Sequence, residues 1–194
     1  MNSITLSEAA SKALLAQYGV PLAADRIHHV GPTAQGFTII GAALAWTLGQ
    51  VHAARQPPGS SARLVRAGFA AMALGAILVM PVVSASVPLW MTFAAWAVGG
   101  LGMGLLFNPT TVVALSSVGE EHAGRASSQL SVADQLGFAS TAAIGGALVG
   151  LADRGHIGLP SALLVSFSLS VGLALVGAVA AGGVRLGSNH AATV

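Results

Sequence analysis

Five long apolar stretches, separated by short polar connections, constrain this chain more than any other feature. A helix needs about 20 apolar residues to cross the hydrocarbon core of a bilayer, which is about 30 Å thick. The sequence therefore predicts an all-α membrane protein with about five transmembrane helices. We place the spans at Thr33 to Ala53, Leu64 to Ser84, Pro88 to Ser117, Ala126 to Ala152 and Leu159 to Val184.

The composition excludes several other classes of protein. The chain is 54% hydrophobic and only 7% charged, whereas about 25% charged residues is usual in a soluble domain. Its eight Lys and Arg residues are scattered, so no basic cluster predicts nucleic-acid binding. The absence of cysteine excludes disulfides and Cys-based metal sites. We expect the lipid bilayer as a partner, and neither nucleic acid nor a cofactor.

The sequence divides into three parts. Residues 1–30 form an N-terminal arm outside the membrane, residues 31–185 hold the five spans, and residues 186–194 form a C-terminal tail. Within the arm, SEAASKALLAQYGVPLAADR resembles the opening of the ATP-grasp region of ADP-forming acyl-CoA ligases. No glycine-rich phosphate loop follows it, so the arm is read either as a coincidence or as a foreign leader.

Arginines in the short loops predict the orientation, because cytoplasmic loops carry an excess of Lys and Arg. One side of the predicted bundle holds Arg55, Arg63, Arg66 and Arg125, whereas the loops of the other side hold only Arg154. We therefore expect a multi-pass protein of the inner (cytoplasmic) membrane with a cytoplasmic C-terminus. The arm would then begin outside, which suggests that helices are missing upstream.

The fourth span contains a carboxylate, Asp134, about nine residues beyond Arg125. An acid at that depth is costly and is usually functional or paired. Because an apolar medium favours its neutral form, such a group can take up and release protons. The alternative is a carboxylate near the headgroups that pairs with Arg125. Small and polar residues share its helical face: Ser127, Ser131, Asp134, Thr141 and Gly145.

Helix packing and a kink are predicted around the same stretch. Gly100 and Gly104 lie one turn apart, so a neighbouring helix could approach closely there. Pro109 removes a backbone hydrogen bond and should bend the third span. Asn108 beside it could line a cavity or only shape the kink. Gly137 and Gly145 are expected to be packing residues, and the candidate substrate or proton pathway comprises Asp134, Asn108, Gln135 and Ser131.

The sequence gives little support for an enzyme or a metal site. Glu120, Glu121 and His122 are residue types that bind zinc, but they occupy a solvated turn without a second ligand set. No serine has a nucleophile-elbow context, and no glycine loop carries a Walker lysine. We therefore expect neither catalytic residues nor a metal.

These motifs, taken in order, resemble the major facilitator superfamily in its fourteen-helix drug:proton antiporter branch. The resemblance runs from about Gly31 to Val184 and is strongest in the segment GLGMGLLFNP. It continues through a loop glycine and a short motif in the fourth span, at Gly124, Gln135, Leu136 and Gly137. Relatives of this branch often have an arginine where Asp134 stands, so the resemblance assigns that residue no role.

The resemblance implies a carrier whose two helical bundles rock about a midplane site. It implies export of small hydrophobic or cationic compounds against an inward flow of protons. This chain would supply part of the C-terminal bundle, and the missing N-terminal bundle or self-association would complete it. We therefore expect a truncated secondary transporter. The alternatives are a non-transporting membrane partner or assembly module and, more remotely, an acyl-CoA ligase fragment fused to a membrane anchor.

Overall fold

The computed structural model describes residues 26–29, 31–57, 59–116 and 118–182. Within these ranges every regular element is helical, which confirms the predicted all-α fold. Most of the predicted N-terminal arm and the predicted C-terminal tail lie outside the described residues. The long helices are α3 (Pro32–Ala54), α4 (Ser61–Val79), α5 (Leu89–Ser116), α6 (Ala123–Asp153) and α7 (Leu159–Gly182), with short 3-10 helices η1 (Met80–Val83) and η2 (Glu120–His122).

Four of the described helical segments are long and apolar enough to cross a membrane. The fifth, in α3, has a shorter apolar part, Ile39–Ala54. The first predicted span therefore has the shortest apolar helix of the five. The four full-length segments are Ser61–Val83, Trp90–Ser116, Glu120–Asp153 and Leu159–Ala181.

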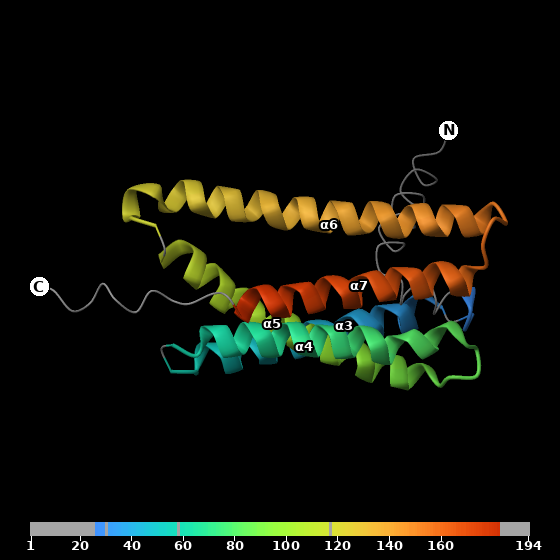
Figure 1. The fold of residues 1–194 in the computed structure, drawn as a ribbon. Helices are drawn as coiled ribbons and strands as arrows, with labels where there is room; N and C mark the ends of the chain where they lie inside the picture. Colours follow the sequence, from blue (N-terminus) through green and yellow to red (C-terminus); the bar gives the residue numbers. More distant parts are fainter. Residues whose placement is uncertain (1–25, 30, 58, 117, 183–194) are drawn as a thin grey trace, which may run out of the picture.

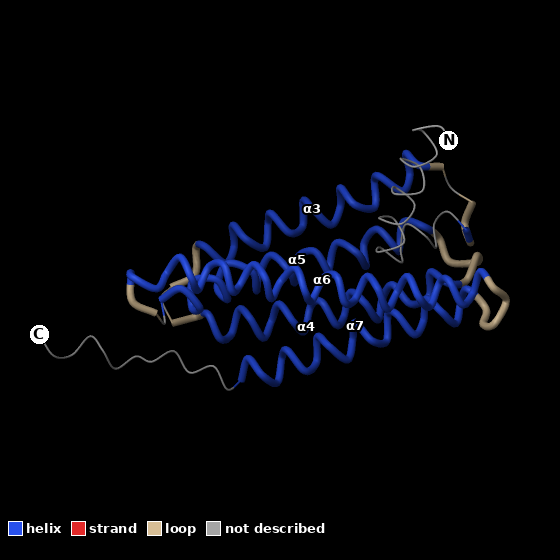
Figure 2. The backbone as a smooth tube through the Cα atoms, turned by 90° about the horizontal axis from the view of Figure 1, so that it is seen from above, coloured by secondary structure: helices blue, strands red, loops and turns tan. Residues whose placement is uncertain are grey.

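The helices run side by side and make two layers (Figure 1). Four of them form a row in the order α3, α5, α4, α7, in which each helix contacts the next, and α6 lies across one face of that row (Figure 2). The sequence order therefore differs from the spatial order, because α5 is inserted between α3 and α4. This arrangement makes α5 the central helix of the row.

Glycines allow α5 to approach both neighbours closely. A Cβ on Gly104 would collide with the Trp46 carbonyl oxygen of α3, and one on Gly100 would collide with the Ala42 carbonyl oxygen. On the α4 side, a Cβ on Gly102 would lie 2.6 Å from the Gly68 carbonyl oxygen. Close backbone approach at small residues is the main source of packing between membrane helices.

The opposing helices contribute matching glycines. A Cβ on Gly49 of α3 would lie 2.6 Å from the Leu101 carbonyl oxygen, and one on Gly75 of α4 would lie 2.6 Å from the Gly99 nitrogen. The α3 contact stripe thus runs through Ala42, Trp46 and Gly49. A Cβ added to Gly41 would meet nothing within 4 Å, so Gly41 is not part of this stripe.

The best-buried side chains gather where η1 meets α5, α6 and α7. Val82 and Leu163 are each 1% exposed, and Val79 and Ala95 are buried beside them. This cluster also includes Val149, from the last turns of α6. The C-terminal part of α6 is therefore fixed to the rest of the bundle.

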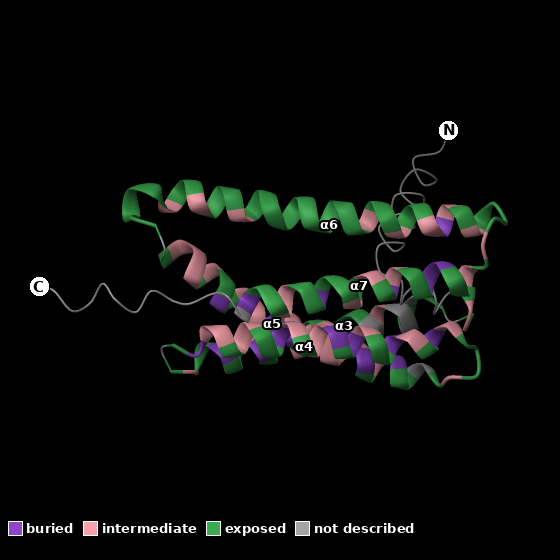
Figure 3. Ribbon diagram, in the orientation of Figure 1, coloured by how far each residue is buried: buried purple, intermediate pink, exposed green. Residues whose placement is uncertain are grey.

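The rest of α6 is far less covered. Every residue from Ser131 to Thr141 is exposed, and Val149 is the one buried residue among those described in this helix (Figure 3). Large apolar side chains such as Leu136 and Val132 are among the exposed residues. In a bilayer these side chains contact lipid rather than water.

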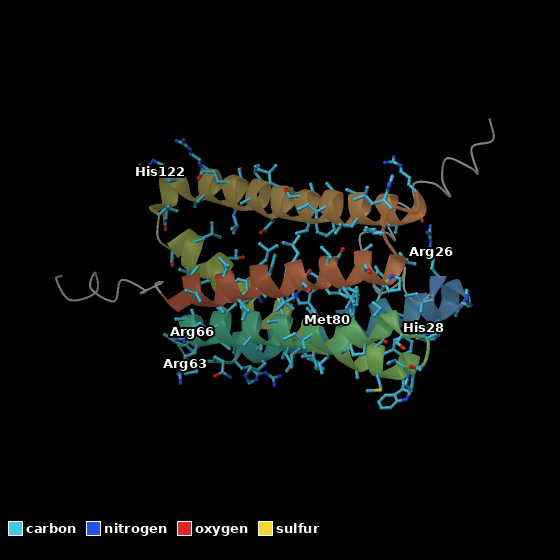
Figure 4. The ribbon with its side chains drawn as sticks, turned by 45° about the vertical axis from the view of Figure 1, so that its right-hand side comes forward. Arg26, His28, Arg63, Arg66, Met80 and His122 are labelled. Carbon is cyan, nitrogen blue, oxygen red and sulfur yellow. The ribbon has the colours of Figure 1, made fainter. Side chains whose placement is uncertain are left out.

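Charged side chains collect at the two ends of the bundle. Arg63 and Arg66 lie at one end with His122, whereas Arg26 and His28 lie at the other (Figure 4). At that second end, the Arg26 guanidinium forms an ion pair with Asp153. The His28 Nε2 donates to the Val82 carbonyl oxygen over 2.9 Å. These charges therefore flank the apolar parts of the helices, whereas Asp134 lies within α6.

Candidate functional site

A cavity of about 520 Å³ lies between α6 and the row formed by α4, α5 and α7. Its walls are mostly apolar, with aromatic rings from four helices. Small-molecule sites are typically cavities of about 300–1,000 Å³ with mostly apolar walls and a few polar groups. Its lining includes Phe69, Met72 and Gly75 of α4, Trp96 and Gly99 of α5, Phe138, Thr141 and Gly145 of α6, and Leu163, Ser166, Phe167 and Ser170 of α7.

The cavity exists because the two layers meet only at their ends and edges. Phe138, Thr141, Gly145 and Val149 recur every three or four residues, so they form one face of α6. Gly145 presents no side chain to that space, and a Cβ built on it meets nothing within 4 Å. On the opposite side of the cavity, α4 and α7 pack closely against each other. A Cβ on Gly177 of α7 would collide with the ring of Phe69 of α4.

Three hydroxyl groups supply the polar surface that can be assigned in the cavity. Ser166 Oγ donates to the Ala162 carbonyl oxygen over 3.0 Å, and Ser170 Oγ donates to the Ser166 carbonyl oxygen over 3.1 Å. Thr141 Oγ1 donates to the Gly137 carbonyl oxygen over 2.9 Å. A hydroxyl has one proton to donate and two lone pairs. These groups therefore face the cavity as hydrogen-bond acceptors.

Asp134 lies on the same face of α6, one turn before Phe138, but it does not line the cavity. The 31 residues of α6 span about 46 Å, so the helix is longer than the hydrocarbon core. Asp134 is about 16 Å from the start of α6, which puts it about 8 Å inside the hydrocarbon if the helix is centred. A centred α6 would thus place this carboxylate at membrane depth.

The side chain of Asp134 has no hydrogen bond or ion pair within the part of the chain that the structure describes. Arg125 is exposed in the first turn of α6, two turns away, and forms no ion pair with Asp134. It lines a separate hollow of about 230 Å³ with His122 and Gln129. The geometry therefore shows no anchoring pair of the kind considered from the sequence.

The other predicted pathway residues are distributed over two helices. Ser131 and Gln135 accompany Asp134 on α6 and are exposed, and Asn108 is exposed on α5. None of the four lines the cavity. The structure therefore brings Ser131, Gln135 and Asp134 together on one stretch of helix and leaves Asn108 apart. Their part in a substrate or proton pathway stays a prediction.

Pro109 lies inside α5 and is buried. The helix continues beyond it to Ser116. The hydroxyls of Thr110 and Thr111 donate to the carbonyl oxygens of Leu106 and Phe107, over 2.7 and 3.0 Å. Beyond this point, the last turns of α5 slant toward the start of α6 (Figure 1). The Phe107 ring meets Trp46 of α3 edge-on, with the ring centroids 6.0 Å apart.

The glycines singled out from the sequence have different surroundings. Gly100 and Gly104 lie at the contact between α5 and α3 described above. Gly137 and Gly145 lie on α6, where an added Cβ would meet nothing within 4 Å. Gly145 is a cavity-lining residue, and the predicted packing role of both α6 glycines stays a prediction.

The α7 wall of the cavity was not predicted from the sequence. Leu163, Ser166, Ser170 and Ala174 recur every three or four residues in the fifth apolar stretch, so they share a helical face. That spacing is visible in the sequence. A serine pair inside a very apolar helix could have directed attention to this face, whereas Phe69 and Trp96 have no local pattern that reveals their meeting.

The Glu120–His122 turn also has a defined geometry. The His122 Nδ1 lies 3.2 Å from the Glu121 Oε1, and both side chains are exposed. In the described parts of the chain, no group of three or more His, Asp or Glu side chains is arranged to hold a metal ion. The turn is a surface ion pair at the end of the bundle.

Comparison with known proteins finds similar chains among transporters. Two curated proteins, both named probable multidrug-efflux transporter, are 31% identical to this chain over 188 residues. They come from Mycobacterium tuberculosis strains CDC 1551 / Oshkosh and ATCC 25618 / H37Rv. Each match covers 91% of this chain and 38% of the relative, so the chain spans less than half the length of these relatives. No family model matches the chain, and no solved structure matches it.

The similarity to transporters and the long apolar helices both indicate a membrane environment. Its described part contains four helices long and apolar enough to cross a bilayer, and their large apolar side chains are widely exposed. The chain is a multi-pass membrane protein.

Proposed function

We propose that this chain forms a helical bundle of a secondary active transporter that exports small hydrophobic compounds in exchange for protons. The observation that carries the proposal is the 31% identity to two probable multidrug-efflux transporters along 91% of the chain. The apolar cavity among membrane helices supports it, since such a cavity suits a hydrophobic cargo. The proton coupling is proposed from the resemblance to drug:proton antiporters of the major facilitator superfamily.

In this proposal the bundle does not work alone. A carrier of this type holds its cargo between two bundles and alternates the side to which the cargo is exposed. The chain covers 38% of each relative. Further helices, from a longer polypeptide, another chain or a second copy, would complete the transporter. The chain by itself is expected to show no saturable, proton-dependent transport.

Asp134 is the proposed proton-binding group. It lies at membrane depth on the face of α6 that continues into the cavity wall, and a neutral carboxylic acid is far less costly there than a carboxylate. Proton release on one side of the membrane would charge the group and favour a conformation that hydrates it. This gives a physical link between protonation and the position of α6.

We also propose that the end holding Arg63, Arg66 and Arg125 faces the cytoplasm, with the protein in the inner membrane. Arg55 directly follows α3, in the short loop that leads to Arg63 in the first turn of α4, whereas Arg26 at the other end is paired with Asp153. The excess of unpaired arginine is the usual mark of a cytoplasmic surface. A reporter enzyme fused after Val194 should be active only in the cytoplasm, and clear periplasmic activity would reverse the orientation.

The direct test is a chimera. The matching segment of a Mycobacterium tuberculosis relative is replaced by this chain, and proton-dependent efflux of a hydrophobic dye is measured in everted vesicles. We expect efflux that collapses when a protonophore dissipates the proton gradient. Asp134→Asn should abolish the proton dependence while leaving membrane insertion intact, and Ser127→Ala on the same helix serves as the control. An inserted chimera that never transports, beside an active parent, would contradict the proposal.

A second candidate is a non-transporting membrane partner that docks another protein. The observation favouring it is the unpartnered outer face of α6, where Val132 and Leu136 are 57% and 63% exposed. Docking through that face would make Val132→Arg and Leu136→Arg disrupt assembly without any effect of a proton gradient. The efflux assay separates the two candidates, because only the transporter requires a response to the protonophore.

A further inference from the structure

We infer that the cavity between α4, α5, α6 and α7 is a binding site for a small uncharged apolar molecule that can carry a hydrogen-bond donor. The inference deepens the proposed function by naming the class of cargo, and as a statement about cargo it rests on that function. Binding, however, can be measured without transport.

The size of the cavity defines the occupant. Its volume of about 520 Å³ fits a molecule with two or three rings, and volumes of this order are typical of small-molecule sites.

The charge of the lining selects a neutral molecule. Among the described residues that line the cavity, none has an ionisable side chain. A buried ion needs an opposite charge or several hydrogen bonds to offset its lost hydration. Asp134 is the nearest carboxylate along the α6 face, but it lies outside the lining, one turn before Phe138. The cargo site and the proposed proton site are thus separate features of one helix face.

The hydroxyl groups select for a donor on the ligand. Ser166, Ser170 and Thr141 each donate their proton to a carbonyl oxygen of their own helix, at 2.9–3.1 Å. Their lone pairs remain for a ligand. A hydroxyl or amine on an otherwise apolar molecule would bond to them, whereas a ligand that can only accept would gain less.

Trp96 provides a reporter inside the site, because it lines the cavity. The test uses the full chain in lipid nanodiscs, with Trp46→Phe and Trp90→Phe to leave Trp96 as the only tryptophan. N-phenyl-1-naphthylamine, an uncharged aromatic amine, serves as the probe, and energy transfer from Trp96 measures its binding. Triphenylmethanol and methyltriphenylphosphonium then compete with it, since they are similar in shape but differ in charge.

Adjacent glycines supply matched variants. Gly145 lines the cavity and Gly146 does not, yet an added Cβ meets nothing within 4 Å at either position. Gly145→Phe fills the space and should weaken probe binding at least about fivefold, while Gly146→Phe should leave it within about twofold of the parent chain. Both variants should insert and fold alike.

We expect saturable binding of the probe and competition by triphenylmethanol at a concentration at least about tenfold below that needed for the phosphonium. Non-saturable transfer, or equal binding in both phenylalanine variants, would overturn the site. Equal potency of the two competitors would overturn its charge selectivity. Probe binding by an inert chimera would instead contradict the transport proposal and leave this site standing.

Discussion

Helices α5 and α6 are both rich in glycine, yet their glycines have opposite surroundings. On α5, Gly100, Gly102 and Gly104 face the backbones of α3 and α4 so closely that an added Cβ would collide. On α6, Gly124, Gly137, Gly145, Gly146 and Gly150 have open space at the same position. Neither the number nor the spacing of glycines therefore decides what they do.

The difference divides the molecule into a tightly packed unit and a loosely attached wall. Helices α3, α5 and α4 touch through their backbones along much of their length, which leaves little freedom for relative movement. Helix α6 is fixed near Val149 and Asp153 and is exposed along Ser131 to Thr141. In the proposed carrier, the packed unit would serve as the scaffold and α6 as the part that responds to cargo and protons.

The strongest test of the division is a methyl group added to α5. Gly104→Ala should destabilise the bundle by about 3 kcal/mol, because the new Cβ would overlap the Trp46 carbonyl oxygen and force α3 and α5 apart. Gly99→Ala is the matched control on the same helix, since its Cβ meets nothing within 4 Å. Unfolding in mixed micelles measures both free energies, and equal values would remove the basis for a packed α3–α5 contact.

The same substitution on α6 should have a smaller effect of opposite sign. Gly137→Ala replaces an open glycine by a better helix former, so the free energy of unfolding should rise by about 0.5–1 kcal/mol or stay unchanged. The measurement is the same unfolding titration. Destabilisation similar to that of Gly104→Ala would mean that α6 packs against a partner through this face.

The ion pair that attaches the α6 end to the N-terminal arm should contribute little. Arg26 and Asp153 have side chains that are 43% and 49% exposed, and pairs of this exposure are typically worth about 0.5 kcal/mol. A double-mutant cycle with Arg26→Ala and Asp153→Ala should give a coupling of that order, weakened by salt. A coupling above about 2 kcal/mol would show that the pair, rather than the cluster around Val149, holds α6 in place.

A second cycle tests whether Asp134 is a structural residue. The structure shows no contact between Asp134 and Arg125, so Asp134→Asn and Arg125→Gln should be additive, with a coupling below about 0.5 kcal/mol. Unfolding free energies of the two single variants and the double variant decide it. A larger coupling would assign Asp134 to anchoring the helix end and would weaken its proposed role with protons.

The sequence was sufficient for the helices but only partly for the site. Runs of about 20 apolar residues predict spans from length alone, and the spacing of Gly100 and Gly104 places them on one helical face. The pairing of α5 with both α3 and α4 depends on which backbones meet, which no local pattern encodes. Similarly, the cavity combines Phe69, Trp96 and Ser166 from separate helices, whereas Asp134 and Asn108 stand out in the sequence as polar residues within apolar stretches.

The central claim is that Asp134 binds protons, which requires that water reach its face of α6 while the opposite face contacts lipid. The chain has no cysteine, so single cysteines can be introduced without background. Ser131 and Thr141 lie on the face of Asp134, whereas Val132 and Leu136 lie about 160° away on the helix.

The deciding measurement is the rate at which a membrane-impermeant maleimide labels each single-cysteine variant in lipid vesicles. The account predicts labelling of Ser131→Cys and Thr141→Cys at least about tenfold faster than labelling of Val132→Cys and Leu136→Cys, because the reaction requires water at the thiolate. Equal rates at all four positions, or faster labelling on the face of Leu136, would contradict it.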